Sequence, residues 1–160
     1  MAFSFSVFGQ NSNESSKILA ITGNIESKDK SNLELADCIA NSAMIEGVTS
    51  YTESENESID SSYVNGNYSY SYYVNDYESE AGSISFKYSY EIKDGVISYK
   101  FYDFIHDGTG TEFKSIGNLP EKWNSEVGEI FTEKQYVEIM KDLFMNSANA
   151  IRMIKKYCVN

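Results

Sequence analysis

The chain has 160 residues, of which 41% are hydrophobic and 14% aromatic, and its formal net charge is −11. This size and composition are typical of one domain with its own hydrophobic core, and they exclude a disordered chain. The acidic balance argues against nucleic acids and anionic membrane surfaces as partners, because binding to both depends on Lys and Arg. No stretch approaches the ~18 apolar residues of a membrane-spanning helix, so we expect no integral membrane segment.

The first nine residues carry no charge, and two interpretations of them stay open. Val7 and Gly9 fit the −3 and −1 positions of a signal-peptidase site, although the basic start of a signal peptide is missing. Alternatively, the apolar residues alternate with serines, which is typical of an extra strand. We therefore divide the chain into residues 1–16, a signal remnant or a flexible or extra-strand segment, and residues 17–160, a single domain. A truncated signal implies an exported protein (periplasmic, cell-envelope or secreted), and its absence implies a cytoplasmic one.

The domain is predicted to begin with one strand and one helix. Residues 17–23 (KILAITG) are the strand candidate. Ser31 and Glu34 have the spacing of a capping box that opens a helix, and Gly47 is placed to end it. Apolar residues at helical spacing predict the buried stripe of this helix: Leu35, Ala36, Ile39, Ala43 and Met44.

After this helix the hydrophobic period changes to two, which is typical of strands. Residues 48–53 and 63–75 are predicted strands, with an acidic loop between them and a second loop over residues 76–83. Asn65-Gly66 within the longer strand fits a bulge or a turn.

Residues 84–105 are predicted to form a β-hairpin. Alternating apolar residues lead into Asp94-Gly95, a dipeptide suited to a two-residue type I′ turn. Counting outward from this turn gives the expected pairs: Lys93 with Val96, Ile92 with Ile97, Tyr90 with Tyr99, Tyr88 with Phe101, Phe86 with Asp103, and Ile84 with Ile105. One face of the hairpin then packs on the core, with Asp103 as its one inward-facing acid, and the other face is largely wet.

The C-terminal part is predicted to contain a long loop and a second helix. Residues 107–131 form a loop of a length that indicates either function or mobility. Thr132 and Gln135 form a second capping box that opens the helix. Its apolar stripe is predicted from helical spacing: Tyr136, Met140, Leu143, Phe144, Ser147, Ile151 and Ile154.

The two cysteines, Cys38 and Cys158, are too few for a disulfide framework or a metal site. They would pair if the two helices that carry them pack side by side. A buried or partly buried free thiol at each position is the simpler expectation.

The order strand, helix, four strands, helix is that of the TBP-like fold. Residues 86–95 (FKYSYEIKDG), together with the aromatic residues after the turn, resemble a bacterial family of domains of unknown function with this fold, found largely in exported proteins. Those following residues are Tyr99, Phe101, Asp103, Phe104 and His106. The resemblance covers residues 18–106 and implies an α+β fold, β-α-β4-α, in which a curved antiparallel sheet of about five strands carries two helices on one face.

This resemblance implies no function. The residues Val96-Ile97-Ser98 depart from the more basic, aromatic stretch that the family commonly has after the turn. The DNA-binding member of the fold grips the minor groove with basic residues and inserted Phe side chains. Here Lys87 and Lys100 stand on the wet face against Glu91, in a chain of net charge −11. We therefore expect no nucleic acid as partner.

Two candidate sites follow from the residues. Asp103, His106 and Asp107 are close in sequence and have the chemistry of a metal or acid–base site, but they fall short of a closed zinc site and also fit a polar strand terminus. A solvent-exposed aromatic surface is the second candidate, since Tyr offers contact area with a hydrogen-bonding tip. Its predicted binding residues are Tyr68, Tyr70, Tyr72, Tyr102 and Trp123, although aromatic residues are also ordinary in strands.

These observations predict a non-enzymatic binding or interaction module of an exported bacterial protein. We expect no metal and no cofactor, and the partner would be a protein, a small molecule or a glycan. The alternative is a small enzyme or a metal-dependent site around Asp103, His106 and Asp107.

Overall fold

The computed structural model describes residues 19–45, 48–54, 61–75 and 79–160, with the backbone alone for residues 43–45 and 48–54. The elements in chain order are β1 (Ile21–Glu26), α1 (Asn32–Ile45), β2 (Val48–Ser54), β3 (Ser61–Val74), β4 (Ser79–Lys93), β5 (Val96–Asp107), β6 (Gly117–Asn118), α2 (Ser125–Gly128), α3 (Glu133–Ile154) and a π-helical turn (Lys155–Val159). The signal-like segment over residues 1–16 and the helix-ending Gly47 lie outside the described residues.

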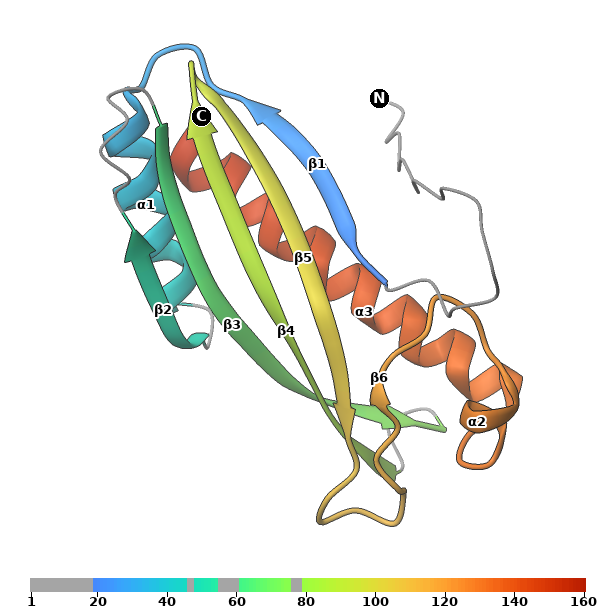
Figure 1. The fold of residues 1–160 in the computed structure, drawn as a ribbon. Coiled ribbons are helices and arrows are strands. Elements are labelled where there is room, and N and C mark those ends of the chain that lie inside the picture. The colour runs from blue at the N-terminus through green and yellow to red at the C-terminus, as the bar shows by residue number, and fades with distance from the viewer. Residues whose placement is uncertain (1–18, 46–47, 55–60, 76–78) are drawn as a thin grey trace.

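The strands form one antiparallel sheet in the order β1-β5-β4-β3-β2, and the two residues of β6 pair with the end of β5. Figure 1 shows α1 and α3 on one side of this sheet, and no helix among the described residues covers the other side, the open face. Alternation along the strands sends apolar side chains toward the helices, so the core lies between the two layers. The predicted α+β class, the five main strands and the two helices on one face are confirmed.

The β4–β5 hairpin follows the predicted register only near its turn. The pairs from Lys93–Val96 to Tyr88–Phe101 are confirmed. Beyond them the register shifts by one residue, so that Ile84 pairs with His106 and Ser85 with Ile105. The pairs Phe86–Asp103 and Ile84–Ile105 were therefore predicted wrongly.

The shift comes from a β-bulge at Asp103, whose backbone has a positive φ of 54°. The extra residue sends Phe104 and His106 into the core, while Ile105 is 41% exposed. Asp103 itself bonds to Lys87 on the open face, which corrects its predicted inward position. A period-two pattern assigns each residue to one face of the sheet by counting along the strand. One inserted residue therefore moves every later side chain to the opposite face.

Three strands begin at positions that differ from the prediction, and one of them is β4, which begins at Ser79 inside the predicted loop over residues 76–83. β1 begins at Ile21, not at residue 17, because Ile21 and Ile25 are the residues that face the core while pairing with β5. β3 begins two residues earlier than expected and passes through Asn65-Gly66 without a bulge or turn. Gly66 is required there because the Tyr88 hydroxyl occupies the space of a Cβ atom.

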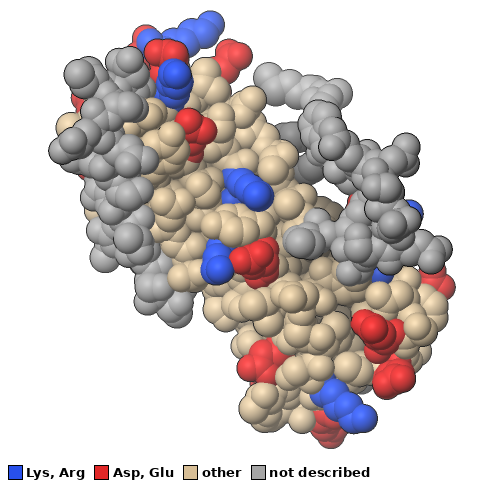
Figure 2. Space-filling model, in the orientation of Figure 1, with Lys and Arg blue, Asp and Glu red and all other residues tan. Residues whose placement is uncertain are grey.

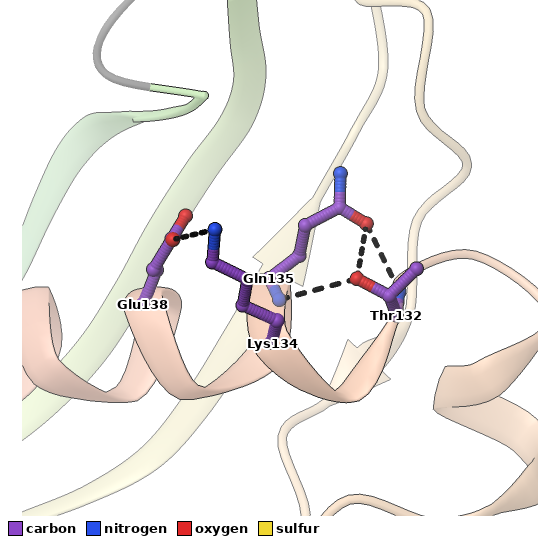
Figure 3. A network of polar contacts seen from close by, with 4 residues as sticks. All are labelled: Thr132, Lys134, Gln135 and Glu138. Atoms are coloured by element: carbon purple, nitrogen blue, oxygen red, sulfur yellow. Dashed lines mark hydrogen bonds and ion pairs between the residues drawn. The ribbon is translucent and has the colours of Figure 1, made fainter.

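Both predicted capping boxes are confirmed. In the first, the Glu34 carboxylate accepts from the Ser31 backbone N–H at 2.9 Å, and the Ser31 hydroxyl accepts from the Glu34 N–H at 3.3 Å. Thr132 and Gln135 form the same reciprocal bonds at the start of α3 (Figure 3).

The predicted helical stripes are mostly confirmed. The buried members are Leu35, Ala36, Ile39, Tyr136, Leu143, Ser147 and Ile154. The side chains of Ala43 and Met44 lie outside the described residues. Phe144 is 42% exposed, contrary to the prediction, and Ile139 is buried in its place, because the buried stripe lies to one side of Phe144 on the helix.

The long segment 107–131 is not a plain loop. It contains β6 and α2, and it contributes Leu119, Val127 and Phe131 to the core. Cys38 and Cys158 form a disulfide that joins α1 to the π-helical turn after α3. The expectation of free thiols was therefore wrong, and the alternative of adjacent helices holds. No helix in the described part of the chain is long and apolar enough to cross a membrane.

Candidate binding site

His106 is a buried structural residue whose two ring nitrogens are both engaged. Nε2 lies 3.1 Å from the carbonyl oxygen of Ala81, and Nδ1 accepts from the Ile116 backbone N–H at 3.0 Å. These partners assign the proton to Nε2. Burial lowers the pKa of His106, so the ring is held neutral. A ligand or proton reaches either nitrogen only by breaking one of these bonds.

Asp103, His106 and Asp107 form their hydrogen bonds with different partners, although Asp107 interacts electrostatically with His106. The Asp103 carboxylate accepts from Lys87 at 2.9 Å on the open face. Asp107 accepts from the Thr109 N–H and the Ser115 hydroxyl, both at 2.8 Å, and these bonds lower its pKa to about 2. No group of three or more His, Cys, Asp or Glu side chains among the described residues is placed to hold a metal ion.

The five predicted aromatic residues do not form one surface. Tyr72 is buried and its hydroxyl donates to the Ala81 carbonyl oxygen, while Tyr68 and Tyr70 are partly buried beneath the helices. The expected solvent-exposed position of this tyrosine face is therefore wrong. Tyr102 lies on the open face, with the Lys100 ammonium 4.9 Å from its ring centroid. Trp123 lies in the segment before α2 and donates to the Phe131 carbonyl oxygen.

The open face carries charged side chains of both signs. Figure 2 shows it with scattered basic and acidic side chains among mostly uncharged residues. The charged pair Lys87–Asp103 is one of these contacts, and its side chains are 54% and 42% exposed. Exposed pairs of this kind contribute little and mark no site by themselves.

A cavity of about 110 Å³ lies between the sheet and the two long helices. Five aromatic rings from three neighbouring strands line its sheet side: Tyr68 of β3, Phe86, Tyr88 and Tyr90 of β4, and Phe101 of β5. Ser42 of α1 and Ala150 of α3 line its helix side, and both are too small to fill the space between the helices. The cavity is therefore an aromatic chamber beneath a gap in the helical layer.

The helix side of the cavity comes mainly from one face of α3. Asn146, Asn149, Ala150 and Met153 recur at helical spacing, so all four turn toward the sheet or the gap. Asn149 is exposed and Asn146 is partly buried, which places the mouth of the cavity along this helix. The amides offer hydrogen bonds at the rim of an otherwise apolar space.

The rim continues into a polar group one turn earlier on α3. The Asn146 side-chain amide donates to the Asp142 backbone oxygen at 3.0 Å and to its carboxylate at 3.3 Å. Burial raises the pKa of Asp142. The Tyr70 hydroxyl is buried and has no hydrogen-bond partner among the described residues. Such a group is costly unless something else satisfies it.

A second, larger cavity of about 380 Å³ lies between β5 and the segment that carries β6 and α2. Three of its polar side chains are already used within the chain: Asp103 by Lys87, Ser115 by Asp107, and Asn124 as the cap of α2. Asn118 and Glu126 also line it. The aromatic cavity is the better candidate because it has an unsatisfied polar group near it.

Sequence reasoning found only one residue of this cavity as a binding residue, Tyr68. It assigned Phe86, Tyr88 and Tyr90 to the core face, which is where they lie. The sequence does contain one signal of this cavity that the prediction did not use: Asn146 and Asn149 are two amides beside an apolar helical stripe.

Comparison with known proteins adds little to this geometry. No protein-family model and no curated protein matches the chain. A solved structure of a TBP-like protein from Parabacteroides distasonis is 13% identical, covers 88% of this chain and 94% of its own, and has a TM-score of 0.45. A DUF4468 family protein from Bacteroides ovatus is 11% identical, covers 86% and 88%, and has a TM-score of 0.44. Both fit the family resemblance in the sequence, but at this level of similarity neither carries an argument about function.

Proposed function

We propose that the protein is a non-enzymatic binding module that takes an apolar or aromatic group into the cavity between the sheet and helices α1 and α3. The observation that carries this proposal is the lining: five aromatic rings on the sheet side face small and amide side chains on the helix side. Binding sites of small ligands combine a mostly apolar wall with a few polar groups that fix orientation in this way.

The volume limits what the cavity takes. Pockets for whole drug-sized ligands measure roughly 300–1,000 Å³, whereas an apolar cavity of about 150 Å³ takes benzene. At about 110 Å³ this cavity suits a single ring or a short branched chain, with the rest of the ligand extending through the mouth. The occupant is therefore one apolar group of a small molecule or of a partner's side chain.

The test is an amide NMR titration of the isotope-labelled protein with phenethyl alcohol, a neutral probe with one ring. We expect saturable shifts at millimolar probe that centre on Tyr88, Tyr90 and Ala150. An absence of shifts, or shifts confined to the open face of the sheet, would contradict the proposal.

A matched pair of variants on α3 sharpens this test. Ala150→Leu places a larger side chain in the cavity and should abolish the shifts. Ala148→Leu makes the same substitution at an exposed position two residues earlier and should leave binding unchanged. Thermal unfolding of both variants shows whether the fold is kept, and equal probe binding by both would overturn the assignment of the site.

We also propose that the module works outside the cytoplasm. The Cys38–Cys158 disulfide supports this, because disulfides persist in oxidising compartments and are rare in the cytosol. Expression with and without export to the periplasm, followed by non-reducing electrophoresis, tests the point. Complete disulfide formation in a reducing cytosol would remove this support.

A further inference from the structure

Asp142 is a carboxylate that contacts Asn146, a residue at the rim of the cavity. It lies on α3 one turn before Asn146, and the Asn146 amide contacts both Asp142 and the cavity. The side chain is partly buried, and it forms no ion pair with any described residue. A carboxylate that is partly withdrawn from water is stabilised by a bound positive charge.

The Tyr70 hydroxyl lies near the same place from the sheet side. Its ring centroid is 5.9 Å from that of Tyr68, which lines the cavity. Burial, and secondarily the Asp142 carboxylate, raises the pKa of Tyr70, so the two groups are electrostatically coupled. The hydroxyl is nonetheless unpartnered within the described part of the molecule. Two oxygen-bearing groups thus lie beside lining residues of the aromatic cavity, Asp142 beside Asn146 and Tyr70 beside Tyr68, and each can accept a further hydrogen bond.

We propose that the ligand of this cavity is an amphipathic amine, whose apolar body lies among the aromatic rings and whose ammonium group binds Asp142 and Tyr70. This inference rests on the proposed function and names its ligand class. An ammonium has three N–H donors and no acceptor, so it can serve both oxygens at once. The tyrosine rings beside it attract a cation further, and a chain of net charge −11 favours cationic ligands over anionic ones.

Three probes that share one ring but differ in charge separate the effect of ligand charge on affinity from the effect of ligand shape. Phenethylamine is a cation at neutral pH, phenethyl alcohol is neutral, and phenylacetate is an anion. We expect the amine to bind about tenfold more tightly than the alcohol, because a charge-assisted hydrogen bond adds to the same ring contacts. Phenylacetate should bind most weakly, since its charge is that of Asp142. The amide NMR titration described above measures all three.

The variant Asp142→Asn removes the charge and keeps a side chain of the same shape. It should reduce the affinity for phenethylamine to that for phenethyl alcohol and leave the alcohol unchanged. The matched control is Glu138→Gln, one turn earlier on α3, where the carboxylate already has Lys134 at 4.0 Å. This control should bind all three probes as the unaltered protein does.

The outcomes separate this inference from the proposed function. If phenethyl alcohol does not bind, the cavity is not a binding site and both fail. If the alcohol binds and the amine has no advantage, or if Asp142→Asn keeps the advantage, the amine assignment alone is overturned. Loss of the advantage in Asp142→Asn but not in Glu138→Gln supports it.

Discussion

At the scale of single residues, His106 shows how a polar side chain can hold a fold together. Its ring connects β5 to Ala81 on β4 and to Ile116 before β6, and it packs edge-on against the rings of Tyr72 and Phe131. Nδ1 satisfies the Ile116 backbone N–H, and Nε2 shares the Ala81 carbonyl oxygen with the Tyr72 hydroxyl. The imidazole is therefore a cross-link between three segments, and only its neutral form makes both bonds.

This arrangement makes stability depend on pH. Burial lowers the pKa of His106 below its ordinary value of 6.5, so the unfolded state binds more protons as the pH falls below that value. The stability gained from the neutral ring is complete above about pH 6.5 and is lost as the pH falls toward the folded pKa. We expect the urea concentration at the unfolding midpoint to decrease as the pH is lowered from about 7 to about 5. The titration of Asp107 does not contribute to this change, because its pKa of about 2 lies below the pH range measured.

The variant His106→Gln tests the assignment. Glutamine keeps a donor and an acceptor but does not titrate, so the variant should be less stable at neutral pH and its midpoint should change less over the same range. An unaltered pH dependence in this variant would show that another group is responsible.

At the scale of elements, the start of α3 depends on a reciprocal pair of hydrogen bonds. The Thr132 hydroxyl accepts from the Gln135 backbone N–H at 3.3 Å, and the Gln135 side chain accepts from the Thr132 N–H at 3.0 Å (Figure 3). The neighbouring pair Lys134–Glu138 is longer, at 4.0 Å, and its Lys134 side chain is 89% exposed. The cap therefore matters more to the helix than the ion pair does.

We expect Thr132→Ala to lower the free energy of unfolding by about 1 kcal/mol, because the Gln135 backbone N–H loses its acceptor, the Thr132 hydroxyl. Thr132→Ser keeps the hydroxyl and should retain most of the stability. Lys134→Ala should cost less than about 0.5 kcal/mol, as exposed pairs do. Urea denaturation of the three variants measures this order, and a larger loss in Lys134→Ala than in Thr132→Ala would contradict it.

How far the sequence predicts each element depends on how local its cause is. The capping boxes at Ser31 and Thr132 and the Asp94-Gly95 turn lie within four residues, and all were predicted. The bulge at Asp103 has no local signature, because an aspartate with positive φ looks like any other strand residue in the pattern. The cavity was also out of reach, since it depends on small residues of two helices, Ser42 and Ala150, facing rings from three strands.

At the scale of the whole molecule, the disulfide joins parts of the chain that are far apart in sequence. Cys38 and Cys158 are 120 residues apart, and the bond closes a loop that contains most of the sheet. The same junction is supported by Lys30, whose ammonium donates to the Cys158 carbonyl oxygen at 2.6 Å. Ser42 lies 3.5 Å from the Cys158 sulfur and also lines the aromatic cavity. The disulfide thus fixes the two helices on either side of the proposed binding site.

We expect the double variant Cys38→Ser, Cys158→Ser to lose about 2–5 kcal/mol of stability, because cross-linking a long loop restricts the unfolded chain. It should also bind phenethyl alcohol more weakly, since α1 and the end of α3 are no longer held at one spacing above the sheet. Urea denaturation and the NMR titration measure the two effects. Dithiothreitol should bring the unaltered protein to the same values and leave the variant unchanged. A variant that is destabilised but binds the probe with full affinity would show that packing alone positions the helices around the cavity, and that the disulfide acts only on the unfolded state.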